Sequence, residues 1–182
     1  MALLLLDLGA AKESGDQFRD YLRQKDADPE GYLGLGEAEF AQHDYQAADE
    51  AFRNALKLRP EDPALQKRFL ECGQILALDP TLRGLSSAEK NRRSRLLLEE
   101  IVHAFEPCLQ DMNTEAGSEI HGLMESAQKV LLAKPKQGEY GVDTEKNLAL
   151  VESLWEKGGG RCRISLGTDD ALSRAVAKLS AR

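Results

Sequence analysis

The stretch from residue 32 to residue 63, YLGLGEAEFAQHDYQAADEAFRNALKLRPEDP, constrains the fold of this chain more than any other. Its apolar residues recur at intervals of three and four, the spacing that places side chains on one face of an α-helix. Gly36, Ala48 and Ala55 lie on that face, where a helix usually carries bulky core residues. Because the distance between packed helices depends on the side chains at their contact, we expect two antiparallel helices that approach each other closely.

Local signals mark where these two helices begin and end. Asp28 predicts an N-cap, because its side chain can accept hydrogen bonds from the first backbone amides of a helix at about 29–42. The proline that follows Asp28 suits the first helical position. Residues 43–44 predict a tight turn, and a second helix is expected at 45–58. Pro60 then separates this helix from the next segment.

A shift of the sequence by 34 residues against itself superimposes five pairs of identical residues within a short window. Such self-similarity at a fixed period is typical of helical repeat proteins. The pairs are Phe18 with Phe52, Arg19 with Arg53, Leu22 with Leu56, Asp28 with Asp62 and Pro29 with Pro63.

The helical pair resembles a tetratricopeptide repeat (TPR). The positions that carry the resemblance are Tyr32, Leu35, Gly36, Ala48, Phe52, Ala55 and Pro60. Glu39 departs from the family pattern, which usually has an aromatic residue there, and Phe40 lies beside it. The resemblance covers residues 1–80, with one clear unit at about 29–62 and a partial unit, a helix at 63–78, after it. It implies a TPR-like helix-turn-helix α-solenoid.

A degenerate unit is expected before the clear one. Its shortened first helix would lie at 2–14 and its second helix at 16–25. The apolar residues at the start of the chain are interrupted by Asp7, and no basic segment precedes them. We therefore expect neither a signal peptide nor a membrane-spanning helix there.

The resemblance also implies where a partner would bind. In TPR proteins the first helix of each unit lines a concave groove that holds a peptide or a partner helix. The groove candidates in this chain are Glu30, Leu33, Glu37, Phe40, Lys67 and Glu71. The subset of the family that grips a C-terminal carboxylate has Lys and Asn where Leu33 and Glu37 stand, so we expect a basic or amphipathic helical peptide instead.

The repeat pattern is not found in residues 81–182. This part of the sequence predicts a C-terminal helical region that packs on or caps the solenoid. Ser86 and Glu89 have the spacing of a capping box, which predicts a long helix from there to about residue 109. We expect a loop at 111–118 and a linker at 134–143. The remaining helices are expected at 119–133, at 144–157 with the glycines at 158–160 ending it, and from Thr168-Asp169-Asp170 to about Ser180.

Composition and charge favour an all-α protein that does not bind nucleic acid. Aromatic residues make up 5% of the chain, whereas helix-favouring Ala, Leu, Glu, Arg and Lys are abundant. Residues 1–80 contain nine basic and 16 acidic residues, and the rest contains 15 of each. An acidic first half and a balanced second half argue against a general affinity for a phosphate backbone.

One dense basic cluster, consisting of Lys90, Arg92, Arg93 and Arg95, opens the long helix. One interpretation is a solvated helix face whose cations pair with Glu99 and Glu100. The other is a patch for an acidic partner or for the acidic half of a second copy of the chain. RNA binding is not expected, because the aromatic residues that stack on bases are absent from the cluster.

Motifs that carry catalysis or cofactor binding are not found, so we expect no enzyme, no cofactor and no metal site. His43, His103 and His121 do not form an HExxH motif. The glycine triplet lacks the Gly-Lys-Ser/Thr ending of a phosphate-binding loop. The three cysteines form no CxxC pair and are typical of unpaired thiols in a reducing compartment. Trp155 is expected in the core or between helices.

These expectations converge on a non-catalytic, cytoplasmic scaffold that binds a protein or peptide in a TPR-like groove. The alternative is a regulatory or assembly subunit that acts through its C-terminal helices, including self-association. Neither hypothesis requires a nucleic acid or a membrane.

Overall fold

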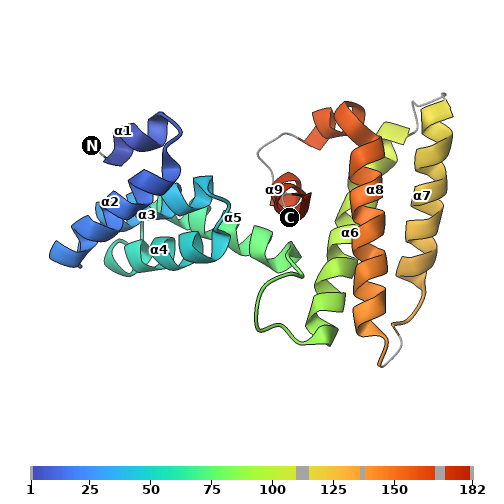
Figure 1. Cartoon of the computed structure of the whole chain (residues 1–182), viewed down its shortest axis with the longest axis horizontal. Helices are drawn as coiled ribbons and strands as arrows, with labels where there is room; N and C mark the ends of the chain where they lie inside the picture. The colour runs from blue at the N-terminus through green and yellow to red at the C-terminus, as the bar shows by residue number, and fades with distance from the viewer. Residues whose placement is uncertain (1, 110–114, 136–137, 167–170, 181–182) are drawn as a thin grey trace. The chain divides into compact units, whose positions relative to one another are not determined.

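The computed structural model describes residues 2–109, 115–135, 138–166 and 171–180 (Figure 1). Every regular element in this part of the chain is a helix, which confirms the predicted all-α class. The chain divides into two compact units, Met1–Leu76 and Ala77–Arg182. Among the described residues, none of the helices combines the length and the hydropathy that crossing a bilayer requires.

The first unit is a series of helices in which each of the first three contacts the next. They are α1 (Ala2–Asp7), α2 (Ala11–Gln24), α3 (Pro29–Ala41), α4 (Tyr45–Leu58) and α5 (Pro63–Leu78), whose last two residues belong to the second unit. The predicted helices at 29–42, 45–58 and 63–78 are confirmed. The predicted boundary between the first two helices was wrong, because α1 ends at Asp7 and α2 begins at Ala11.

The helix ends follow the local signals. The side chain of Asp28 accepts a hydrogen bond of 3.1 Å from the Glu30 amide, and Asp44 accepts one of 3.1 Å from the Ala47 amide. His43 takes a positive φ of 60° and turns the chain between α3 and α4. Each cap satisfies an amide that has no partner within the helix.

Two glycines of α3 set its distance from the helices on either side. A Cβ atom on Gly36 would lie 2.4 Å from a ring carbon of Phe52 in α4, and one on Gly34 would lie 2.1 Å from a ring carbon of Phe18 in α2. The three atoms nearest to such a Cβ on Gly36 all belong to the Phe52 ring, and Ala48 and Ala55 of α4 are fully buried. Both aromatic rings are buried, so α3 is packed closely on two faces.

Glu39, the acid that departs from the TPR pattern, is buried and forms an ion pair with Arg19 of α2. Burial raises the pKa of its carboxyl group above the ordinary value, and the charge of Arg19 opposes that rise. Arg19 also pairs with Asp16 at 2.7 Å. An α2–α3 ion pair therefore stands where the resemblance places an aromatic contact.

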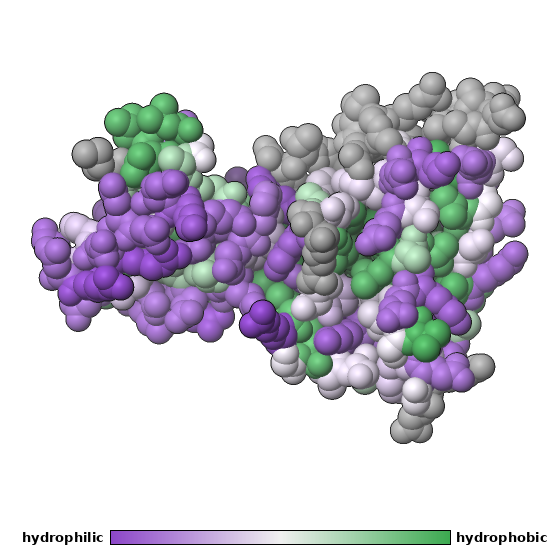
Figure 2. Space-filling model, viewed as in Figure 1, coloured by the Kyte–Doolittle hydropathy of each residue, from purple (hydrophilic) through white to green (hydrophobic). Residues whose placement is uncertain are grey.

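The first helix of this unit, α1, exposes apolar side chains. None of the residues of α1 is buried, and Leu3, Leu4 and Leu8 are exposed. Figure 2 shows hydrophobic residues gathered over α1, whereas the visible face of the following helices is mostly hydrophilic.

The second unit packs three long helices, α6 (Ser87–Leu109), α7 (Glu115–Leu132) and α8 (Tyr140–Leu166), against one another. The shorter α9 (Ala171–Ser180) contacts α6 and α8 (Figure 1). The fully buried large side chains of this core are Leu97, Leu98, Ile101, Phe105, Ile120, Val151, Leu154 and Val176. Trp155 is 7% exposed and stacks on Phe105 with ring centroids 6.4 Å apart, which confirms its place in the core.

The glycine triplet does not end a helix, and that prediction was wrong. The α8 helix continues through residues 158–160 to Leu166. A Cβ atom on Gly158 would lie 2.3 Å from a ring carbon of Phe105 in α6, so this glycine permits a close α6–α8 contact. Tertiary packing here outweighs the low helix propensity of glycine.

Other helix boundaries in the second unit also differ from the predicted positions. The predicted loop at 111–118 is shorter, because α7 already begins at Glu115, and the predicted linker at 134–143 overlaps the start of α8 at Tyr140. The predicted start of the last helix at 168–170 lies outside the described residues.

Candidate functional site

The predicted groove residues of α3 and α5 meet at Arg68, which the sequence reasoning missed. The Nε atom of Arg68 donates a hydrogen bond of 2.7 Å to Oε1 of Glu37, and its Nη2 donates to the other oxygen of that carboxylate. Its Nη1 donates to Glu71 at 2.9 Å. The guanidinium group lies over the ring of Phe40, 4.7 Å from the centroid. These four residues, Glu37, Phe40, Arg68 and Glu71, are called the Arg68 cluster below.

Arg68 changes the electrostatics of the predicted groove residues, because its hydrogen bonds neutralise part of the charge of Glu37 and Glu71. The hydrogen bonds from Arg68 to Glu37 raise the pKa of the guanidinium above its ordinary value, although burial opposes that effect. One cation sits between two carboxylates, so the cluster keeps a net charge of −1. A planar fork that binds a carboxylate with two parallel bonds is a strong, geometrically specific contact. The cluster therefore fastens α5 to α3.

The other groove candidates lie outside this cluster. Glu30 is exposed and pairs with Arg59 at 2.9 Å. Leu33 is half-buried and Lys67 is exposed. Phe40, within the cluster, is only 3% exposed and lies beneath Arg68, so it is part of the core. The sequence does contain one signal for Arg68, because Glu71 follows it at the i,i+3 spacing of a helical ion pair.

The surroundings of Cys72 disfavour nucleophilic reactions of its thiol. The side chain is buried on α5, and burial raises the pKa of its thiol to about 12. A thiol, not a reactive thiolate, is therefore present at neutral pH. The side chains of Cys108 and Cys162 lie outside the described residues. Within the described part of the chain, no three His, Cys, Asp or Glu side chains are grouped closely enough to hold a metal ion.

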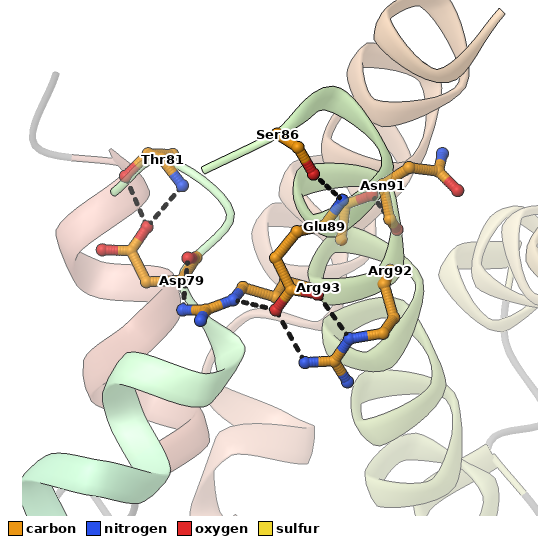
Figure 3. Close-up of polar contacts among 8 residues, drawn as sticks. Asp79, Thr81, Ser86, Glu89, Asn91, Arg92 and Arg93 are labelled. Carbon is orange, nitrogen blue, oxygen red and sulfur yellow. Dashed lines mark hydrogen bonds and ion pairs between the residues drawn. The ribbon is translucent and has the colours of Figure 1, made fainter. Parts of the chain in front are cut away.

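The basic cluster at the start of α6 is largely engaged within its own unit (Figure 3). Glu89 accepts two hydrogen bonds of 2.8 Å from Arg92 and one of 2.7 Å from Arg93. Ser86 caps the helix as predicted, because its Oγ accepts a hydrogen bond of 3.2 Å from the Glu89 amide.

Arg93 and Arg95 also bind backbone carbonyls. Arg93 donates to the carbonyl oxygen of Asp79 at 3.4 Å. Arg95 donates to the carbonyls of Val130 and Leu131, at 3.0 and 2.6 Å, near the C-terminal end of α7. Cations are stabilised there because the last carbonyls of a helix lack intrahelical partners.

The predicted pairing with Glu99 and Glu100 was wrong, since no ion pair joins the described part of the cluster to either acid. Each arginine reaches an acceptor on a neighbouring turn or a neighbouring segment instead. Lys90 forms no ion pair with any described residue.

Asp79 ties the segment before α6 to α9. Its side chain is 2% exposed, its Oδ1 accepts hydrogen bonds from the amide (2.8 Å) and the hydroxyl of Thr81, and its Oδ2 pairs with Lys178 at 2.8 Å. Burial raises the pKa of this carboxyl group, but the hydrogen bonds from Lys178 and Thr81 outweigh burial and hold the pKa below its ordinary value. Asp79 is thus an ionised anchor of the second unit.

Glu89→Gln is expected to lower the melting temperature at pH 7. The hydrogen bonds from Arg92 and then Arg93 lower the pKa of Glu89 from 4.5 to about 2. Because the folded-state pKa lies below the unfolded one, the ionised group stabilises the protein above its unfolded pKa, and this contribution is lost as the pH falls through the folded pKa. The difference in melting temperature between wild type and variant should therefore decrease as the pH is lowered from 4.5 to 2.

Thermal unfolding across that pH range measures the effect. Glu100→Gln is the matched control, because Glu100 is exposed on the same helix and should show little change at any pH. A wild-type-to-variant gap that stays constant down to pH 2 would contradict the role assigned to Glu89.

The Arg68 cluster joins two helices of the first unit, and the basic cluster joins segments of the second. Comparison of the chain with protein-family models, with curated proteins and with solved structures found no match.

Proposed function

We propose that the chain is a non-catalytic protein-interaction module whose first unit is a TPR-like solenoid. In this proposal the surface beside the Arg68 cluster, on α3 and α5, receives a basic or amphipathic helical segment of another protein. The observation that carries it is the coupling of these two helices: Arg68 holds Glu37 and Glu71 on one face, with Phe40 beneath the guanidinium. Helices held rigidly in register present a preorganised surface, which lowers the entropic cost of binding.

The close packing of α3 supports the repeat part of the proposal. Gly34 and Gly36 bring α3 against α2 and α4, and small residues at helix contacts were the feature that suggested a helical repeat. Successive helices that each pack on the next are what a solenoid requires.

The charge of the first unit supports a basic partner. Residues 1–76 contain nine basic and 15 acidic residues, and the Arg68 cluster itself retains one negative charge. The face visible in Figure 2 is hydrophilic over α2 and α4. Complementary charge accelerates encounter and suppresses wrong partners.

The alternative, an assembly subunit that acts through its basic cluster, has less support. Arg92, Arg93 and Arg95 already donate to Glu89 or to backbone carbonyls of the same unit. A patch whose cations are used internally offers fewer unpaired donors to an acidic partner.

Leu33→Lys is expected to weaken binding of a lysine-rich amphipathic helical peptide to the full chain by about tenfold, or roughly 1.4 kcal/mol. Leu33 is half-buried on α3 between Glu30 and Glu37, so a new cation there would repel the peptide and remove an apolar contact. Fluorescence anisotropy at physiological salt measures the dissociation constant.

Gln46→Lys is the matched control, because it adds the same charge at an exposed site of α4. Its affinity should stay near that of wild type. If the two variants, both folded by circular dichroism, bind the peptide equally well, the groove is not the binding surface.

A further inference from the structure

Three leucines form an apolar surface on the first helix of the chain. Leu3, Leu4 and Leu8 are 63%, 58% and 74% exposed, and they are called the leucine patch below. Leu4 and Leu8 are about one helical turn apart and therefore lie on one face, with Leu3 beside them. Figure 2 shows this apolar surface next to the mostly hydrophilic surface of the following helices. Exposed apolar patches with a polar rim mark interaction sites on soluble proteins.

The helix that carries the patch is held at both of its ends. The Oγ atom of Ser14 in α2 donates a hydrogen bond of 2.8 Å to the carbonyl oxygen of Ala2. At the other end Gly9 takes a positive φ of 79°, and its amide and the next one donate to the carbonyls of Leu6 and Leu5, at 3.0 and 2.8 Å. This is the Schellman arrangement that ends a helix. The leucine patch is therefore presented in a defined orientation.

Two opposite charges border the patch. Asp7 is exposed at the end of α1 and Lys12 is exposed in the first turn of α2, and neither forms an ion pair with any described residue. In an interface with two-fold symmetry, a residue that meets a second residue of the partner is itself matched by the reverse contact. Asp7 of each copy would then meet Lys12 of the other. Such an interface has an apolar centre and a charged rim, as protein interfaces usually do.

A lipid surface matches the patch less well than a second copy does. Helices that lie on membranes are rich in Lys and Arg on their polar face, whereas α1 carries Asp7 and no base. Residues 1–76 contain nine basic and 15 acidic residues, so anionic lipids would repel this unit. A second copy supplies leucines for the leucines and a cation for Asp7.

We propose that two copies of this chain associate through their α1 helices in a two-fold symmetric dimer. The leucine patches pack against each other at the centre, and two reciprocal Asp7–Lys12 ion pairs set the register at the rim. An interface built on so short a helix is smaller than the roughly 800 Å² per partner of stable complexes, so the dimer is weak. The interface lies on α1 and the start of α2, and it does not depend on the peptide-binding role proposed for α3 and α5.

Sedimentation velocity and light scattering on the full chain test the proposal at concentrations from about 10 μM to about 1 mM. Physiological salt is used, because it screens repulsion between the acidic first units beyond about 8 Å. The mass is expected to rise from the 20.1 kDa of one chain towards twice that value. A mass that stays at one chain throughout would overturn the proposal. A monomer that binds phosphatidylcholine vesicles instead would assign the patch to a lipid surface, with the same consequence.

A pair of leucine variants tests the centre of the interface. Leu3→Lys should weaken dimerisation by about tenfold or more, because it places like charges opposite each other near the two-fold axis. Leu70→Lys is the matched control, since Leu70 is also 63% exposed but lies on α5, and it should dimerise like wild type. Equal dimerisation of the two variants, both folded by circular dichroism, would exclude the leucine patch as the interface.

Exchanging the two charges tests the pairing at the rim. Asp7→Lys and Lys12→Asp should each weaken self-association, because each places like charges opposite each other. The double variant Asp7→Lys/Lys12→Asp should recover the dimer, since it restores both ion pairs with their signs reversed. An equimolar mixture of the two single variants should also associate, because one variant supplies two cations and the other two anions. If neither the double variant nor the mixture associates more tightly than the single variants alone, the two-fold pairing is wrong.

Discussion

Gly36→Ala is expected to destabilise the first unit by about 2 kcal/mol, although alanine is the better helix former. A Cβ atom at this position would meet three ring carbons of Phe52 at 2.4, 2.6 and 2.9 Å, and that ring is fully buried. Overpacking a core costs about 1–3 kcal/mol, and the severe overlap here places the cost at the upper end of that range. The gain in helix propensity, about 1 kcal/mol, offsets only part of it.

Urea denaturation followed by circular dichroism measures the change, and Gly73→Ala provides the control. Gly73 is an exposed helical residue of α5 with no atom near its Cβ position, so alanine there should stabilise by about 0.5–1 kcal/mol. The double variant Gly36→Ala/Phe52→Leu should lose less stability than the sum of the two single changes, because the smaller side chain relieves the overlap. If Gly36→Ala stabilises as Gly73→Ala does, then Gly36 does not determine the spacing of the pair.

Asp79→Ala is expected to destabilise the second unit by about 3 kcal/mol. Removing one partner of a buried ion pair costs about 3–5 kcal/mol, and the lower end applies because the Lys178 side chain is 23% exposed and can reach water. The variant also leaves the amide and hydroxyl of Thr81 without their acceptor. Thermal unfolding at pH 7 measures the loss.

The pH dependence of Asp79→Ala tests the cause. The folded-state pKa of Asp79 lies below its ordinary value, so its stabilising contribution is present above an unfolded pKa of about 4 and is lost as the pH falls through the folded pKa. The gap between wild type and variant should therefore shrink on acidification. Asp26→Ala, at an exposed position, is the control and should change little. A loss below 1 kcal/mol at pH 7 would show that Asp79 is not an anchor.

Helix starts that carry a capping side chain were predictable, because a cap depends on neighbours within a few residues. Asp28 and Ser86 cap the helices that follow them, and each bond joins a side chain to an amide two or three positions away. The same local reasoning failed at Gly158, where propensity predicted a helix end. The ring of Phe105, 53 positions earlier, fits against this glycine inside a continuous helix.

The candidate sites were predictable only in part. Glu37 and Glu71 were identified from the repeat pattern, but the pattern does not reveal that Arg68 joins them, because Glu37 and Arg68 are 31 positions apart. The basic cluster was likewise visible in the sequence. That Arg95 caps α7, 35 and 36 positions later, was not.

The sequence by itself determined the helical class, most helix starts and the acidic balance of the first half, since propensity, capping and charge are properties of short segments. The tertiary structure alone decided which glycines are packing contacts and which charges are neutralised. These properties arise from distant residues that folding brings within a few ångströms of one another. The small residues of the first helical pair illustrate the difference: the sequence placed Gly36 on an inner face, and the fold set the ring of Phe52 against it.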